Sequence, residues 1–287
     1  MLSWQVGAVK ITRVVEMELP VAYSAERPFL AEATPAALRA TPWLYPNFVD
    51  EEDRMRLSIH ALLVEAPGLR LVVDTCVGND KVRPGLLGKK PLSTNFLQQM
   101  ADIGWTRDSV DTVVCTHLHV DHVGWNTMLE DGKWVPTFPK ARYLMGKTEL
   151  AHWQGEKDDG DTQEILADSV QPILDAGLAQ LVDMDHRLSP EIRLTPTPGH
   201  TPGHVSVMIE SKGQTAVITG DMTHHPCQMA HPDWSPPFDS DPKAAATMRR
   251  AMFAQWADQP ILVIGTHYAG PTAGHVKTDG EAFRFDA

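Results

Sequence analysis

The segment T-H-L-H-V-D-H-V-G-W, residues 116–125, brings three histidines and an aspartate close together, and it follows an apolar run at 113–115. Within six residues it offers His117, His119, Asp121 and His122. Residues two apart in an extended segment project to the same side, so His117 and His119 can bind one ion while Asp121 and His122 face a neighbouring one. Imidazoles with a carboxylate suit zinc, with iron, manganese and cobalt as alternatives. The segment therefore predicts a transition-metal site at the end of a buried strand.

Other short apolar runs also end in a metal-competent residue. Each run is followed by small and polar residues, a pattern typical of buried strands whose ends converge. The residues concerned are Asp74 after 71–73, His200 after 192–194, Asp221 after 216–218 and His267 after 261–264. We therefore expect the ends of several strands to contribute to one metal site.

These motifs occur in the same order as in the metallo-β-lactamase-fold hydrolase superfamily, which the chain resembles over residues 58–268. The resemblance implies seven ligands around two ions: His117, His119 and His200 for the first, Asp121, His122 and His267 for the second, and Asp221 as the bridge. It also implies that Asp74 lies behind the ligands, where it would accept a hydrogen bond from a ligand histidine and hold its orientation. We expect His204, at the start of the apparent strand 205–209, to have a structural or supporting role.

Strands and helices are interspersed along both halves of the chain. We expect strands at 6–18, 57–65, 69–74, 142–145 and near 192, 205, 216 and 261, and helices at 93–103, 147–153, 162–176 and 242–258. The last helix follows Asp239-Ser240-Asp241, whose acidic residues suit an N-terminal cap. The pattern predicts the α/β class: an αββα four-layer sandwich with the metal site at one edge of the two sheets. We expect one domain over 1–287, with residues 20–53 as an N-terminal arm or cap.

Composition disfavours several classes of partner. The net charge of −12 argues against nucleic-acid binding, which needs clustered Lys and Arg. The N-terminus lacks a basic region followed by a long apolar stretch, and no apolar run reaches the length of a membrane helix, so we expect a cytoplasmic protein without a membrane partner. The three cysteines lack C-x-x-C spacing, which argues against a disulfide framework or a thiolate zinc site.

The expected ligand set also indicates a reaction type. Zinc lowers the pKa of a bound water to about 7, so a pair of ions predicts hydrolysis by an activated water. Asp121 is the candidate catalytic residue, carrying a proton to the leaving group. Flavin-linked di-iron relatives typically have Glu at the position of His119, and true β-lactamases generally lack an aspartate corresponding to Asp221. Both activities are therefore disfavoured.

The stretch G-D-M-T-H-H, followed by H-P-D-W and G-T-H-Y-A-G-P, resembles quorum-quenching N-acyl homoserine lactonases and methyl parathion hydrolase. The resemblance implies hydrolysis of a lactone or carboxylic ester, with an N-acyl homoserine lactone as the prototype and a phosphotriester as the alternative. A glyoxalase II-like thioesterase is disfavoured, because only Lys277 and Arg284 are basic after His267. A mononuclear iron persulfide dioxygenase stays open from the motif alone, although no glutathione-binding signature supports it.

Candidate substrate contacts lie beside the ligands or in the arm. They are His224, Tyr268, Trp125, Met222 and Phe48, and each is equally compatible with a packing role. His224 or Tyr268 would be the group that contacts a substrate carbonyl. Because related enzymes are commonly dimers and residues 20–53 could lie across a partner subunit, we expect a homodimer acting on a small-molecule ester or lactone.

Overall fold

The computed structural model describes residues 1–84, 88, 90–156 and 160–287, and its strands within these ranges form two large sheets and a hairpin. The first sheet contains, in spatial order, β1 (Ser3–Val6), β2 (Val9–Val21), β3 (Met55–Ala66), β4 (Leu69–Val73), β5 (Thr112–Val114), β8 (Arg142–Gly146) and β9 (Ala179–Val182). The second contains β10 (Ile192–Pro196), β11 (Val205–Ser211), β12 (Gln214–Ile218), β13 (Ile261–Ile264), β14 (Ala273–Asp279) and β15 (Ala282–Asp286). The hairpin pairs β6 (Thr127–Glu130) with β7 (Lys133–Pro136).

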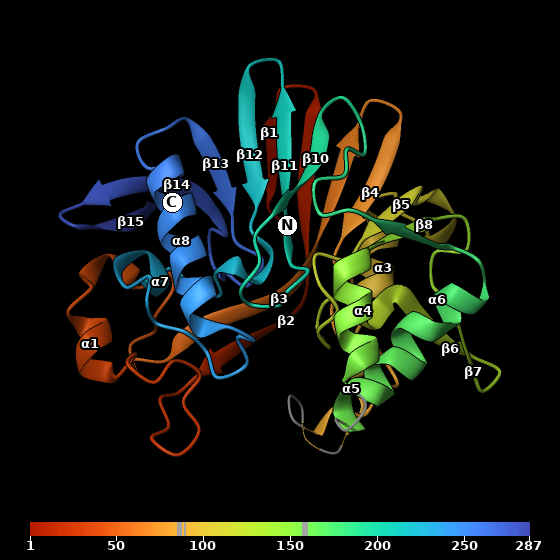
Figure 1. The fold of residues 1–287 in the computed structure, drawn as a ribbon, viewed down its shortest axis with the longest axis horizontal. Coiled ribbons are helices and arrows are strands. Elements are labelled where there is room, and N and C mark those ends of the chain that lie inside the picture. The colour runs from red at the N-terminus through yellow and green to blue at the C-terminus, as the bar shows by residue number, and fades with distance from the viewer. Residues whose placement is uncertain (85–87, 89, 157–159) are drawn as a thin grey trace.

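Within the described ranges the helices are short apart from one near the C-terminus. They are α1 (Pro35–Arg39), α3 (Phe96–Asp102), α4 (Lys147–Gly155), α5 (Gly160–Ile165), a π-helical segment (Leu166–Val170), α6 (Gln171–Asp175), α7 (Cys227–Ala230) and α8 (Pro242–Trp256). Short 3-10 turns lie at Pro42–Leu44, Arg107–Ser109, Gly124–Asn126 and Gly220–Met222. In Figure 1, α8 and the helices α4 to α6 lie on opposite sides of strands β10 to β12.

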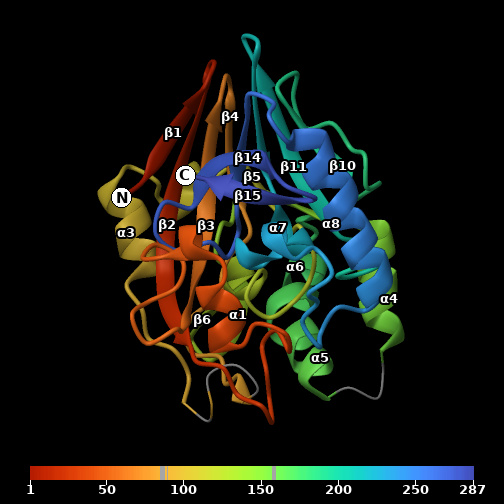
Figure 2. The same cartoon turned by 90° about the vertical axis from the view of Figure 1, so that its left-hand side faces the viewer.

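The layers follow from the two-residue alternation of side chains along the strands. On β3, Leu62 and Val64 face an apolar cluster shared with the second sheet, whereas Leu63 faces a cluster that includes residues of α3, α4 and α6. On β11, Val207 joins the shared cluster and Met208 joins the cluster that includes α8. Strands buried on both faces pack between helices, and Figure 2 shows them between α3 and α8. The predicted four-layer αββα architecture is confirmed.

Residues 20–53 pack against the body of their own chain. Leu30, Leu38, Leu44 and Phe48 are buried in the same cluster as Trp256 of α8. The segment therefore covers the outer face of the second sheet near α7 and α8, as Figures 1 and 2 show for α1.

Parallel pairing brings strand ends together at one edge of each sheet. Strand β4 pairs in parallel with β5, and β12 pairs in parallel with β13. The carboxyl ends of these strands lead into the residues singled out in the sequence: Asp74, the segment 116–125, Asp221 and His267. The loop after β10 adds His200 at the same edge.

Several elements differ from the sequence-based expectation. The strand expected at 6–18 corresponds to β2, which begins at Val9 and runs to Val21, and Gly7 and Ala8 form the turn that joins it to the unpredicted β1. Gly7 has φ of 58°, a conformation that a glycine adopts without strain in a two-residue turn. Strands β6, β7, β9, β14 and β15 were not predicted, because none of them contains a continuous run of apolar residues like those of β5, β12 and β13. The helix expected at 162–176 is interrupted by the π-helical segment.

No helix within the described ranges combines the length and the apolar character that crossing a bilayer requires.

Candidate metal centre

Three imidazoles meet nitrogen to nitrogen at the end of β5. His119 Nδ1 lies 3.0 Å from His117 Nε2 and 2.8 Å from His200 Nε2, and the two Nε2 atoms are 3.2 Å apart. Burial lowers the pKa of all three histidines well below the usual value, so the rings are neutral. A neutral imidazole has one nitrogen lone pair, which is the form that binds a metal. Three such nitrogens converging on one point fit a divalent cation.

A second group lies beside the first. Asp121, His122 and His267 bring their ligand atoms within 4.8 Å of one another. The Asp121 carboxylate spans the two rings, with Oδ1 3.6 Å from His122 Nε2 and Oδ2 3.6 Å from His267 Nε2. Two imidazoles with a carboxylate are again a donor set that suits a divalent transition metal.

Asp221 lies between the two groups. Its Oδ2 is 3.6 Å from His117 Nε2 and 3.2 Å from His122 Nε2, while its Oδ1 is 3.1 Å from His267 Nε2. Burial alone would raise the pKa of Asp221, but His122 and His267 together hold it well below the usual value, so the carboxylate is ionised. The structure therefore brings the other six residues proposed as ligands together around the ionised carboxylate of Asp221.

The opposite nitrogens of the rings are held by acceptors from other parts of the chain. His122 Nδ1 donates to Asp74 Oδ2 at 2.9 Å, and His267 Nδ1 donates to the Ser58 carbonyl at 3.0 Å. Fixing one nitrogen as the donor aims the other nitrogen at the centre, where a divalent ion would displace its proton. Asp74 also accepts from the Thr116 backbone N–H at 2.8 Å, which ties it to the His segment. Asp74 thus lies where the resemblance implied.

Asp239 holds His200 in the same way, and sequence reasoning missed it. Its Oδ1 accepts from His200 Nδ1 at 2.8 Å, while Oδ2 lies 3.3 Å from Nη1 of the buried Arg249 on α8. The sequence indicates only a capping role for Asp239, but Asp241 is the residue that caps α8. An acidic residue far from its partner in sequence carries no local signal of such a contact.

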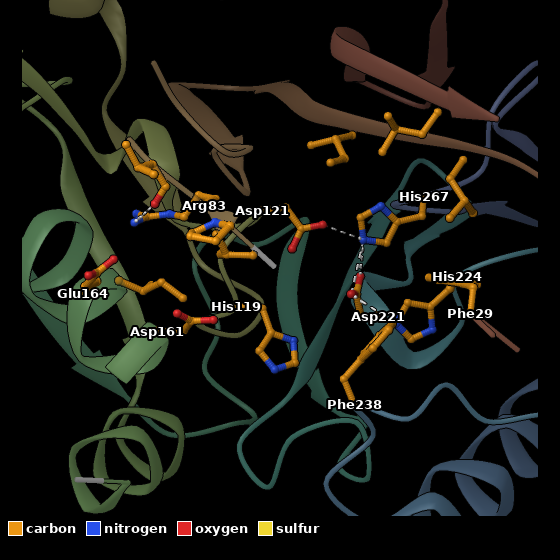
Figure 3. Close-up of a pocket in the computed structure, with 17 residues that line it drawn as sticks. Phe29, Arg83, His119, Asp121, Asp161, Glu164, Asp221, His224, Phe238 and His267 are labelled. Atoms are coloured by element: carbon orange, nitrogen blue, oxygen red, sulfur yellow. Dashed lines mark hydrogen bonds and ion pairs between the residues drawn. The ribbon is translucent and has the colours of Figure 1, made fainter. Parts of the chain in front are cut away.

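A cavity of about 410 Å³ opens onto the metal centre. The residues at its metal end are His119, Asp121, Asp221, His224 and His267. Its apolar wall is formed by Leu19, Phe29, Leu57, Ile59 and Phe238, and its far wall includes Val82, Arg83, Asp161, Glu164 and Ile165. Figure 3 shows Arg83, Asp161 and Glu164 across the pocket from Asp221, His224 and His267. The cavity therefore has a metal-facing end, apolar sides and a charged far wall.

Of the five predicted substrate contacts, His224 alone lines this cavity. Its Nε2 lies 3.3 Å from Asp221 Oδ2, and its ring stacks parallel to His267. Phe29 and Phe238 pack edge-on against the same ring. His224 is thus held at the junction of the metal centre and the apolar wall.

The other four predicted substrate contacts are packing residues in the structure. Trp125 stacks on Phe96, and its indole donates to Glu16. The Tyr268 hydroxyl lies 2.9 Å from Thr223 Oγ1, and Met222 and Phe48 are core residues. Trp125, Met222 and Tyr268 are near a ligand in sequence and Phe48 lies in the arm, but the fold turns all four side chains into the apolar core. The apolar wall is formed instead by Phe29, Phe238 and residues of β2 and β3, which sequence reasoning did not single out.

The comparisons with known proteins agree with this geometry. The family model described as the metallo-beta-lactamase superfamily matches residues 54–267. An N-acyl homoserine lactonase from Bacillus sp is 25% identical over 221 residues, which cover 73% of this chain and 81% of that protein. A similar lactonase from Bacillus cereus is 23% identical over 74% of this chain and 82% of that protein.

Solved structures show the same fold. The hydrolase AbOPH of the beta lactamase superfamily superposes with a TM-score of 0.80 at 25% identity, covering 99% of this chain and 96% of that one. AidC, a dizinc quorum-quenching lactonase, superposes with a TM-score of 0.80 at 21% identity over the same shares. Since the family model spans most of the chain and the His/Asp cluster forms a divalent metal site, the protein belongs to the metallo-beta-lactamase superfamily and is a metal-dependent hydrolase.

Proposed function

We propose that this protein hydrolyses a lactone or carboxylic ester, with an N-acyl homoserine lactone as the prototype substrate, and that it uses two zinc ions. The observation that carries the proposal is the convergence of seven ligand-competent side chains, with Asp221 between the two groups, at the end of a cavity with apolar sides. The resemblance to lactonases supports the choice of substrate class.

Most of the residues at this centre would hold the ions, and Asp121 would also move a proton. When bound, divalent ions supply Lewis acidity toward a carbonyl oxygen and lower the pKa of a water. His117, His119 and His200 would hold one ion, and His122 and His267 with Asp121 would hold the other. Asp221, in contact distance of both groups, would be shared. Because Asp74 and Asp239 fix the orientation of their histidines, little rearrangement is required on binding.

Asp121 is the carboxylate placed to move a proton. Its side chain is 17% exposed and lines the cavity, whereas the Asp221 side chain is 4% exposed. A carboxylate that faces both the centre and the cavity can accept a proton and release it to a leaving alkoxide. His224 is placed to donate a hydrogen bond to a substrate oxygen, because its ring borders both Asp221 and the cavity.

The apolar sides favour a substrate with a hydrocarbon part next to the reacting carbonyl. Phe29 and Phe238 lie on one side of His224, and Leu57 and Ile59 contribute further apolar wall. Burial of apolar surface contributes about 25 cal/mol per Å², so these walls would contribute to the binding of an acyl chain.

A hydrolysis panel on metal-analysed protein tests the proposal. The panel compares acyl homoserine lactones, aryl esters, a phosphotriester, a thioester and a cephalosporin, with Asp221→Ala as the inactive control. We expect the lactones or aryl esters to give the highest kcat/KM and the protein to contain two zinc ions per chain. Dominant turnover of the phosphotriester, thioester or cephalosporin would reject the substrate class, and a single iron per chain would reject the binuclear zinc site.

We also propose a homodimer, which light scattering at micromolar concentration tests directly. The packing of residues 20–53 does not favour a dimer, because Leu30, Leu38, Leu44 and Phe48 are buried within their own chain. A monomer in solution would contradict the proposal.

A further inference from the structure

One buried carboxylate outside the metal centre contacts both segments that supply the first group of imidazoles. Glu149 on α4 is 1% exposed. Its Oε1 accepts from the Leu118 backbone N–H at 3.1 Å, and its Oε2 accepts from the Gly203 backbone N–H at 3.0 Å and from Thr201 Oγ1 at 2.7 Å. The Trp153 indole donates a further bond to Oε1 at 2.6 Å. An ionised carboxylate has about four acceptor positions, so these four donors use its full capacity.

The donors stand next to the proposed ligands. Leu118 lies between His117 and His119, and Thr201 directly follows His200. The ligands His117 and His200 are 83 residues apart in sequence, so neither segment restrains the other through the chain. The Glu149 carboxylate is a single group that accepts hydrogen bonds from both segments.

Close packing supports this arrangement. A Cβ at Gly203 would lie 2.3 Å from the backbone nitrogen of Glu149, so the loop rests directly on the first turn of α4. Trp153, one turn further along α4, places its ring 5.1 Å from that of His119. One face of α4 therefore contacts both segments.

We propose that Glu149 is a positioning residue that sets the separation between the His117–His119 segment and His200, and through it the metal affinity of this three-imidazole group. Hydrogen bonds to an ionised acceptor are about twice as strong as neutral ones, which suits a restraint on two loops. Ligands held near their final geometry before the ion binds lose less freedom on binding. The inference rests on the proposed function, because it assigns Glu149 a part in the same metal centre.

Glu16 provides a matched control. It is also a buried carboxylate, and it accepts from the backbone N–H groups of Val77 and Gly78 and from the Trp125 indole. Trp125 lies in the same segment 116–125, but six residues beyond His119, and none of these donors adjoins His117, His119 or His200. Replacing either residue by glutamine removes one charge and one acceptor oxygen at a comparable depth.

The test compares Glu149→Gln with Glu16→Gln and with the unchanged protein. In Glu149→Gln the new amide group must face either the Leu118 or the Gly203 backbone N–H, and neither can accept a hydrogen bond, so one tether is lost. Affinity for Co²⁺ is measured by chelator competition, and the visible d–d absorption of the Co²⁺ protein reports ligand geometry. Thermal unfolding of the metal-free forms measures stability separately. We expect Glu149→Gln to weaken metal affinity by about 10- to 100-fold and to shift the d–d bands.

The outcomes separate this inference from the proposed function. If the unchanged protein binds no Co²⁺, the proposed metal centre fails. If the unchanged protein binds Co²⁺ and Glu149→Gln binds it equally tightly with the same spectrum, or if Glu16→Gln weakens binding as much, the role of Glu149 is overturned. Should Glu149→Gln not fold, Thr201→Val removes one donor while keeping the shape of the side chain. Weaker affinity in that variant supports the role of Glu149, and unchanged affinity rejects it.

Discussion

The backbone N–H of Asp221 donates a hydrogen bond to His204 Nε2 at 2.8 Å. The other ring nitrogen, Nδ1, lies 3.1 Å from the Thr197 carbonyl, to which it donates. Burial lowers the pKa of His204 to about 4, so the ring is neutral near pH 7 and its Nε2 can accept. His204 thereby holds the backbone that presents the Asp221 carboxylate to both groups of imidazoles.

Gly220 is the point at which this arrangement is most sensitive to substitution. It has φ of 55°, and a Cβ there would lie 2.5 Å from His204 Nε2. Gly280 has a similar φ of 62° but open space around the same position. We expect Gly280→Ala to lose about 1–2 kcal/mol from backbone strain alone, and Gly220→Ala to lose more and also to bind metal less tightly. Urea unfolding and metal titration measure both effects, and equal losses in the two variants would contradict the expectation.

Asp239 and Arg249 form a buried ion pair behind His200, and both side chains are fully buried. Asp233 and Arg250 form a comparable pair on the surface, with side chains 64% and 51% exposed. Removing one member of a buried pair leaves an uncompensated charge, so we expect Asp239→Ala to lower the free energy of unfolding by about 3–5 kcal/mol. Asp233→Ala should cost about 0–1 kcal/mol. Chemical unfolding of both variants is the measurement.

The two variants should also differ in metal binding. Only Asp239→Ala frees the His200 ring, so only this variant should lose metal affinity, by about 10- to 100-fold. An Asp239→Ala protein that is folded and binds metal as tightly as the unchanged chain would show that Asp239 does not position His200.

Phe238 lies at the cavity and is 43% exposed, and Leu129, on the β6–β7 hairpin, is 41% exposed. If Phe238 contacts a substrate's acyl chain, Phe238→Ala should lower kcat/KM by about tenfold for a long-chain lactone, which corresponds to about 1.4 kcal/mol. The loss should be smaller for a short-chain lactone, and Leu129→Ala should leave both values unchanged. Steady-state kinetics with the two chain lengths decides, and equal losses for both lengths would argue against a chain-binding role.

Metal removal should lower stability as well as activity. An ion that binds only the folded chain stabilises it by about 2.7 kcal/mol when its free concentration is 100 times the dissociation constant. We expect chelator-treated protein to unfold at lower urea concentration, and added zinc to restore both the midpoint and turnover. Asp221→Ala should lose most of the zinc-dependent shift, because Asp221 is within reach of both groups. An unfolding midpoint that does not respond to zinc in the unchanged protein would count against the metal centre.

The local sequence pattern was sufficient to predict the ends of the strands and the four-layer sandwich. The apolar runs at 113–115 and 261–264 and the polar residues that follow them are contiguous, so their order could be interpreted without knowledge of distant contacts. The pocket wall could not be predicted in this way. Trp125 follows His122 closely in sequence, yet its ring packs on Phe96 and its indole bonds to Glu16, a residue of β2. Phe29 carries no motif at all, and it reaches the cavity because residues 20–53 fold back on the second sheet.

The sequence by itself determined which side chains stand at the ends of the strands and that their types suit a divalent metal, because spacing along a strand depends only on near neighbours. The tertiary structure decided how those side chains are held. Asp239 on His200, His204 on Asp221 and Glu149 on two loops are contacts between segments far apart in the chain. They arise only when packing of the layers brings those segments together and leaves each buried polar group in need of a partner.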